Sequence, residues 1–188
     1  MNFTIVLGAI VAIGAFLVFL YNRLVALRQT RNNAFSDIDV QLKQRFDLVP
    51  QLVETVKGYA AHEKETFQNV TNARAGVAAA QNGADGERLA AEGKLGGALM
   101  NLFAVAENYP DLKADQNFQK LMSELSDIEN KIAAARRFFN NATAEYNTAT
   151  EQFPAVLIAN SFGFQREEFF ELGEAEAEAV HTAPEVKF

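Results

Sequence analysis

The first pattern along the chain is an apolar, uncharged run from residue 3 to residue 20, FTIVLGAIVAIGAFLVFL. A helix needs about 20 residues, at roughly 1.5 Å of rise each, to cross the hydrocarbon core of a bilayer. Charged residues are spread through the rest of the chain. The pattern predicts one membrane-spanning helix, assigned to residues 1–22 and embedded in the lipid bilayer, followed by a soluble part.

A cleavable signal peptide is the competing interpretation of this run. It requires basic residues first and a small-residue cleavage site afterwards, but two uncharged side chains precede the run and residues 24–26 make a poor site. We therefore expect a retained anchor. Gly8, Ala12 and Ala15 share one helical face, which either lets two spanning helices approach closely or reflects the general abundance of small residues in such helices.

Basic residues directly after the span predict its orientation. Arg23, Arg28 and Arg31 lie within the zone where arginine and lysine set topology. We expect the soluble part to lie in the cytoplasm and the short N-terminus to lie outside.

Four segments with apolar residues at helical spacing follow, and no alternating pattern of useful length indicates strands. They cover residues 22–45, 47–81, 87–108 and 118–153. Asp47 as an N-cap and Pro50 in a first turn predict a break and a chain reversal between the first two. Residues 82–86 form the next predicted loop. The sequence thus predicts an all-α fold, with the anchor followed by an antiparallel bundle of about four long helices.

The segment from 118 to 153 carries the clearest periodicity of the soluble part. Its apolar residues alternate steps of three and four over five heptads, which predicts a seam that packs along its whole length. The partner is either the rest of its own bundle or another chain in a coiled coil. In the preceding segment, close packing is the expected reason for Gly93, Gly96 and Gly97.

Composition excludes several kinds of chemistry. The chain has no cysteine and only two histidines, His62 and His181, so neither a thiol nucleophile nor a common zinc site is expected. The phosphate-binding, dinucleotide-binding and serine-hydrolase motifs do not occur. The net charge of −7 disfavours nucleic acid as a partner. We expect a protein that is not an enzyme and binds no cofactor or metal.

Several motifs resemble the signature of the LemA family. The longest is DVQLKQRFDLVPQLVETVKGYAAHE at residues 39–63; others lie at 69–74, 101–112, 129–147, 153–154 and 161–164. The resemblance implies a single-anchor protein of the bacterial inner membrane, with an antiparallel bundle of long helices and no established enzymatic activity. One branch of the family belongs to magnetosome membranes, which suggests a role in membrane organisation.

Most of the longest motif has a structural explanation, because its apolar residues are expected in the core. Four polar residues remain on the expected outer face as a candidate interaction surface: Gln51, Glu54, Lys57 and His62. The alternative is that they form a solvated helix face.

The chain changes character after Pro154. Phenylalanines are concentrated there, and an acidic tail follows, so we separate residues 154–188 from the bundle at 23–153. The candidate contact residues are Phe162, Phe164, Phe169 and Phe170. These rings either cover the end of their own bundle or dock onto a neighbouring chain.

These features together predict a non-enzymatic, membrane-anchored helical scaffold that forms a homo-oligomer and organises membrane or envelope proteins. The alternative is a monomeric adaptor that presents its bundle to a membrane protease, transporter or signalling protein.

Overall fold

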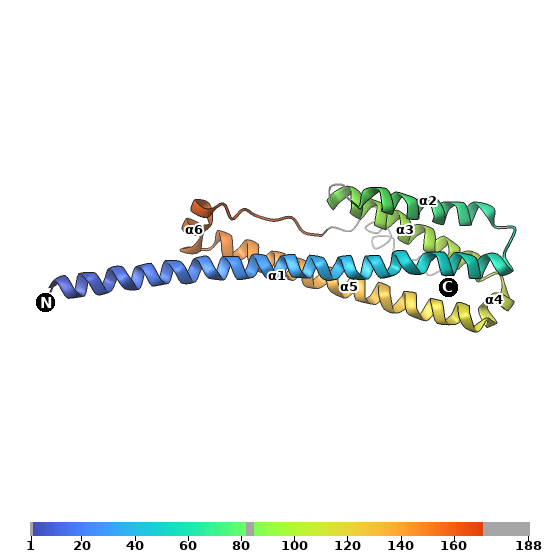
Figure 1. The fold of residues 1–188 in the computed structure, drawn as a ribbon, viewed down its shortest axis with the longest axis horizontal. Coiled ribbons are helices and arrows are strands. Elements are labelled where there is room, and N and C mark those ends of the chain that lie inside the picture. The colour runs from blue at the N-terminus through green and yellow to red at the C-terminus, as the bar shows by residue number, and fades with distance from the viewer. Residues whose placement is uncertain (1, 82–84, 171–188) are drawn as a thin grey trace, which may run out of the picture. The chain divides into compact units, whose positions relative to one another are not determined.

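The computed structural model describes residues 2–81 and 85–170, and within them the regular elements are helices (Figure 1). They are α1 (Asn2–Tyr59), α2 (Lys64–Ala80), α3 (Asp85–Ala106), α4 (Pro110–Ala114), α5 (Gln116–Glu151) and α6 (Ala155–Phe162). The predicted all-α fold with one long apolar N-terminal helix is confirmed. Two of the predicted helices, 87–108 and 118–153, correspond to α3 and α5 within two residues at each end.

The described residues form two compact units. One unit contains residues 2–39 and 132–170, and the other contains residues 40–131. Each unit therefore combines one part of α1 with one part of α5. The predicted boundaries at residues 22 and 153 remain a prediction; α1 is continuous across the first, and the second lies between α5 and α6.

The predicted break at Asp47–Pro50 is wrong, because α1 continues through Pro50 to Tyr59. A proline inside a helix leaves the carbonyl four residues earlier without its usual N–H donor. That carbonyl belongs to Phe46, and Arg74 Nε donates a hydrogen bond to it at 3.2 Å. The guanidinium of Arg74 also stacks on the Phe46 ring, 3.9 Å from its centroid. A side chain of α2 thus replaces the missing helical donor.

Asp47 is therefore not an N-cap. It accepts a hydrogen bond from Lys43 Nζ, one turn earlier on the same helix, at 2.6 Å. The chain reverses only after Tyr59, over residues 60–63, where the second helix, α2, follows. Of the predicted loop at 82–86, residues 82–84 lie outside the described part of the chain, and the last two begin α3.

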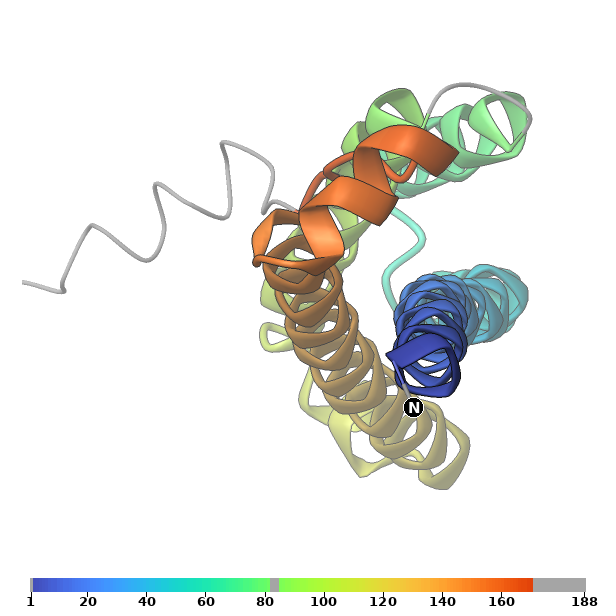
Figure 2. The same ribbon diagram turned by 90° about the vertical axis from the view of Figure 1, so that its left-hand side faces the viewer.

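In the first unit, α6 folds back across the end of α5 (Figures 1 and 2). The core here combines apolar residues from three distant parts of the sequence. Its buried members are Leu20, Leu24, Tyr146, Ala149, Ile158, Ala159 and Phe164. A second group stacks the rings of Phe35, Phe139 and Phe170. The beginning of α1, the end of α5 and the C-terminal segment therefore share one core.

In the second unit, α2 and α3 lie side by side as a hairpin. The core residues contributed by α1 are Leu42, Leu48, Val49, Leu52, Val53 and Val56. The hairpin contributes Val70, Val77, Leu95, Leu99 and Leu102.

Along the predicted heptad seam, the residues buried within the chain are Phe118, Leu125, Ile128, Ile132, Phe139, Ala142, Tyr146 and Ala149. The seam thus packs mostly against its own chain.

Candidate functional site

The N-terminal part of α1 exposes apolar side chains over the predicted span. Residues 3–19 are exposed, and the first buried residue is Leu20. In the described part of the chain, α1 is the one helix that is long and apolar enough to cross a membrane, with a mean hydropathy of 2.8 in its most apolar window. Gly8, Ala12 and Ala15 lie on this exposed stretch, and a Cβ added at Gly8 would meet nothing within 4 Å. Among the described residues, no side chain therefore packs on Gly8.

Aromatic rings surround the point where the span ends. The ring of Tyr21 meets those of Phe162 and Phe164 edge-on, with centroids 5.1 and 5.7 Å away. Arg28 places its guanidinium 4.8 Å from the centroid of Phe164. The chain turns back at Gly163, whose φ of 73° is easily reached without a Cβ. The segment that follows α6 is therefore anchored directly beside the base of the span.

Two asparagines of α5 hold the backbone of this returning segment. Asn147 donates to the carbonyl of Glu167 and accepts from its N–H, both at 2.9 Å. Asn140 does the same with Phe170, at 3.0 and 2.8 Å. Because the asparagines are seven residues apart, they project from one face of α5. These paired amide contacts fix an extended segment against a helix, and the sequence reasoning missed them.

Arg31 ties α1 to the same segment. Its guanidinium lies 3.2 Å from the Glu167 carboxylate and donates to Thr143 Oγ1 at 3.2 Å. It also stacks over the Phe139 ring at 4.8 Å. An arginine that was counted only as a topology signal therefore also has a structural role.

The four candidate phenylalanines divide into two pairs. Phe164 and Phe170 are buried in the core of their own unit, as expected for rings that cover their own bundle. Phe162 and Phe169 are exposed. The structure therefore leaves open a contact with another molecule only for the exposed pair.

The four candidate polar residues are exposed. Gln51, Glu54 and Lys57 lie on α1, whereas His62 lies in the turn that follows it. Lys57 Nζ lies 2.9 Å from the Glu54 carboxylate and 5.9 Å from the Phe67 ring centroid. The two charges therefore already neutralise each other, and their role as an interaction surface remains a prediction.

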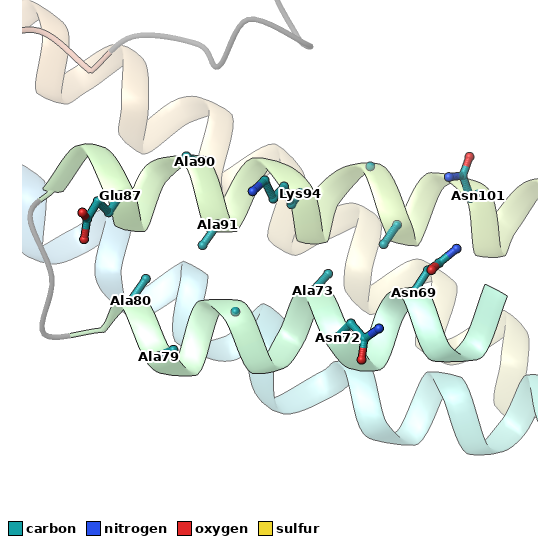
Figure 3. Close-up of a pocket in the computed structure, with 13 residues that line it drawn as sticks. Asn69, Asn72, Ala73, Ala79, Ala80, Glu87, Ala90, Ala91, Lys94 and Asn101 are labelled. Carbon is teal, nitrogen blue, oxygen red and sulfur yellow. The ribbon is translucent and has the colours of Figure 1, made fainter. Parts of the chain in front are cut away.

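An open groove of about 910 Å³ runs between α2 and α3 (Figure 3). Small residues form its floor: Ala73 and Ala80 on α2 and Ala91 on α3 point into the gap between the helices. Glu87 and Lys94 lie along the α3 side. The lining is therefore mostly apolar and made of small side chains, with one negative and one positive charge.

Close packing within the chain does not explain the glycines of α3. A Cβ added at Gly93 or Gly97 would meet nothing within 4 Å, so that expectation is wrong for both positions. A Cβ at Gly96 would lie 3.8 Å from Arg45 Nη1, which is ordinary contact. Gly97 lines the groove, together with Gly76 of α2, which is equally unobstructed.

A buried ion pair joins α1 to α3 of the hairpin. Arg45 Nη2 lies 2.6 Å from a Glu92 oxygen, and both side chains are 3% exposed. Arg45 Nη1 also reaches the half-exposed Glu129 of α5 at 3.0 Å. Burial alone would lower the pKa of Arg45, but Glu129 and Glu92 raise it above its ordinary value, so the guanidinium stays charged. No sequence pattern identified Glu92 as the partner of Arg45.

Tyrosine–carboxylate hydrogen bonds join the segments that connect the helices of this unit. Tyr59 donates to Asp115 at 3.0 Å, and Tyr109 donates to Glu63 at 3.1 Å. Asp115 also accepts the N–H of Phe118 at 2.8 Å and so caps the start of α5. The hydrogen bond to Asp115 raises the pKa of Tyr59, and the Phe118 N–H lowers the pKa of Asp115. These contacts hold a turn rather than arrange a reactive centre.

Within residues 2–81 and 85–170, no group of three histidine, aspartate or glutamate side chains is arranged to hold a metal ion. Several of the described charged groups join helices through ion pairs. Comparison with known proteins agrees with the motifs. The sequence model of the LemA family matches residues 34–188. The chain belongs to the LemA family.

Named relatives span most of this LemA family chain. The magnetosome protein MamQ of Magnetospirillum gryphiswaldense is 27% identical over 86% of this chain and 68% of its own length. MamQ 2 of Paramagnetospirillum magneticum is 28% identical over 87% and 69%. Protein LemA of Metamycoplasma hominis is 26% identical over 97% and 84%. The predicted family is confirmed, and the fold together with these relatives indicates a membrane-associated helical protein.

Proposed function

We propose that this chain is a non-enzymatic, membrane-anchored scaffold that self-associates and organises other proteins of the bacterial envelope. The observation that carries the proposal is the continuity of α1, which runs from the apolar span into the core of the helical part without a break. An anchor and a core helix that are one rigid element transmit orientation, which a flexible linker would lose. The similarity to proteins named for the magnetosome supports a role in membrane organisation.

The groove between α2 and α3 is the proposed contact with a second copy. Glu87 and Lys94 are seven residues apart, so they lie about 10.5 Å apart on one side of α3. Two α3 helices that pack antiparallel about a twofold axis bring each Glu87 opposite the partner's Lys94. The alanines and unobstructed glycines of the groove allow the helices to approach closely. The two charges on this side of α3 are thus complementary to those of a second copy.

The inner membrane is the proposed location, with the helical part in the cytoplasm. The three arginines after the span support this orientation. An accessible thiol at an introduced cysteine in α5 should react with an impermeant reagent only after the cells are opened. If the thiol is labelled in cells in which only the outer membrane has been permeabilised, the orientation is the opposite of the one proposed.

The mass of the full-length protein in mild detergent, measured by light scattering, tests self-association. We expect a discrete oligomer that Ala90→Trp, in the groove, dissociates. The matched control is Ala104→Trp, on an exposed position of α3 outside the groove, which should leave the mass unchanged. Lys94→Glu should weaken the assembly and Glu87→Lys in the same chain should restore it, because the swap re-creates both pairs.

A monomeric wild-type protein would refute the scaffold. If a defined membrane protein then co-purified with the monomer, the adaptor function would replace it. If neither the Ala90→Trp change nor the charge substitutions alter the mass of the oligomer, the scaffold function stands but the groove is not its interface.

A further inference from the structure

An uncharged loop that contains α6 lies beside the predicted span. Residues 153–165, FPAVLIANSFGFQ, carry no charged side chain. An ion pair closes the base of this loop, since Arg166 Nη1 lies 3.1 Å from the Glu151 carboxylate. Charge is therefore confined to the base, and everything beyond it is apolar or neutral.

One side of α6 is buried and the other is not. Ile158 and Ala159 pack into the core with Leu20 and Leu24 of α1. The loop nevertheless exposes large apolar side chains: Phe153, before α6, is 79%, Leu157 is 59% and Phe162, at the end of α6, is 62% exposed. Three large apolar side chains left open on one short loop form an unusual surface for a protein facing only water.

The position of the loop relative to the span can be read within this unit. The apolar run of residues 3–20 is about 27 Å long as a helix, close to the roughly 30 Å of a hydrocarbon core. Leu20 and Tyr21 therefore lie at the boundary between hydrocarbon and headgroups, where tyrosine is favoured. Phe162 touches Tyr21, so α6 lies at the same level. Figure 1 shows the N-terminal part of α1 extending past α6.

We propose that the loop at residues 153–165 is a second membrane contact. Its exposed side chains, Phe153, Leu157 and Phe162, enter the headgroup and upper acyl region of the bilayer that α1 crosses. Apolar side chains on a helix that lies along the interface bind in this way. The bilayer is the occupant because this surface is continuous with the lipid-facing surface of the span and lacks charge. Attachment at two points restricts the tilt of α1 and hence of the helices it carries.

This inference rests on the membrane placement within the proposed function but not on self-association. The test uses the absence of native cysteine. Leu157→Cys in the full-length chain is labelled with a nitrobenzoxadiazole fluorophore and reconstituted into phosphatidylcholine–phosphatidylglycerol vesicles. We expect most of the fluorescence to be lost with lipids that carry a nitroxide near the headgroup, and little to be lost with aqueous iodide.

Phe138→Cys is the matched control, because Phe138 is also an exposed phenylalanine of this unit. It lies 13 residues before the end of α5, about 20 Å along the helix. The label there should respond to iodide and not to the nitroxide lipid. Phe162→Cys gives a second reading on the loop that does not depend on how the Leu157 variant folds.

Three outcomes overturn the proposal. Quenching of the Leu157 and Phe162 labels by iodide alone means that the loop faces water. Protection from both quenchers, which disappears at one chain per vesicle, means that a second copy covers it. Failure of the protein to float with the vesicles removes the membrane placement itself. In the first two cases the protein floats with the vesicles, so the anchor survives and only this inference fails.

Discussion

The buried pair between Arg45 and Glu92 leads to a prediction about stability. Replacing Glu92 by leucine leaves the guanidinium in the core with the main-chain carbonyl of residue 92 and with Glu129, which is partly exposed, as its charged partner. Replacing Arg45 by methionine leaves a buried carboxylate without its cation. Replacing both residues removes the uncompensated charges together, and Glu129 can turn toward solvent.

The magnitude follows from burial. Removing one partner of a buried ion pair costs about 3–5 kcal/mol, whereas exchanging both for apolar residues of similar volume is often neutral or stabilising. For a chain of 188 residues, each kcal/mol shifts the melting temperature by about 2–4 °C. Each single variant should therefore melt about 6–20 °C below the wild type. The double variant should be more stable than either single variant.

Thermal unfolding of the full-length protein, followed by far-ultraviolet circular dichroism in one detergent, measures these differences. The control is Lys43→Ala, which breaks an ion pair whose side chains are 61% and 56% exposed. That pair should contribute less than about 1 kcal/mol. If Glu92→Leu lowers the melting temperature no more than Lys43→Ala does, the buried pair does not join these helices and the reasoning fails.

Two further predictions concern the ends and irregularities of the helices. Arg74→Met should lower the free energy of unfolding by about 1–2 kcal/mol, measured by chemical denaturation, because the Phe46 carbonyl loses its donor. In a Pro50→Ala background, where the helix supplies an N–H, this loss should be smaller. An unchanged loss would show that Arg74 does not act through the Phe46 carbonyl. The pKa of Asp115 is lower in the folded chain than its ordinary value, so its contribution is present at neutral pH and is lost as the pH falls through the folded pKa. Asp115→Asn should therefore flatten the acid limb of the stability profile, and an acid limb identical to that of the wild type would contradict this assignment.

Sequence patterns predicted the features of the fold that depend on neighbouring residues in the chain. The bounds of α3 and α5 follow from apolar periodicity, which reports one buried face of a helix. The predicted break at Pro50 was wrong because proline removes one hydrogen bond to the Phe46 carbonyl, and Arg74, 28 positions after Phe46, compensates for it. Arg74 carries no mark in the sequence that identifies it as a donor to a main-chain carbonyl. A proline predicts a helix end only when no distant side chain replaces its missing N–H.

The candidate sites were less accessible from sequence for the same reason. Phenylalanine content indicated that the C-terminal segment is unusual, but composition could not separate buried Phe164 from exposed Phe162. That separation depends on how α6 packs on α1 and on how Asn147 holds the following backbone. The seven-residue spacing of Asn140 and Asn147 places both on one face of a helix, but it does not identify the main-chain groups that their amides bind. Only the fold shows that the amides bind an extended segment.

Arg31 has a structural role in the folded chain and a predicted role in topology, and the two would act at different times. In the folded chain its charge is neutralised by Glu167, so a count of free positive charge beside the span would omit it. Topology, however, is set while the span is inserted, and the N-terminal part of a chain is made before its C-terminal part. Arg31 is then unpaired, because residue 167 has not yet been synthesised. The ion pair therefore does not weaken the argument for a cytoplasmic helical part, and Glu167→Gln should lower stability without changing orientation.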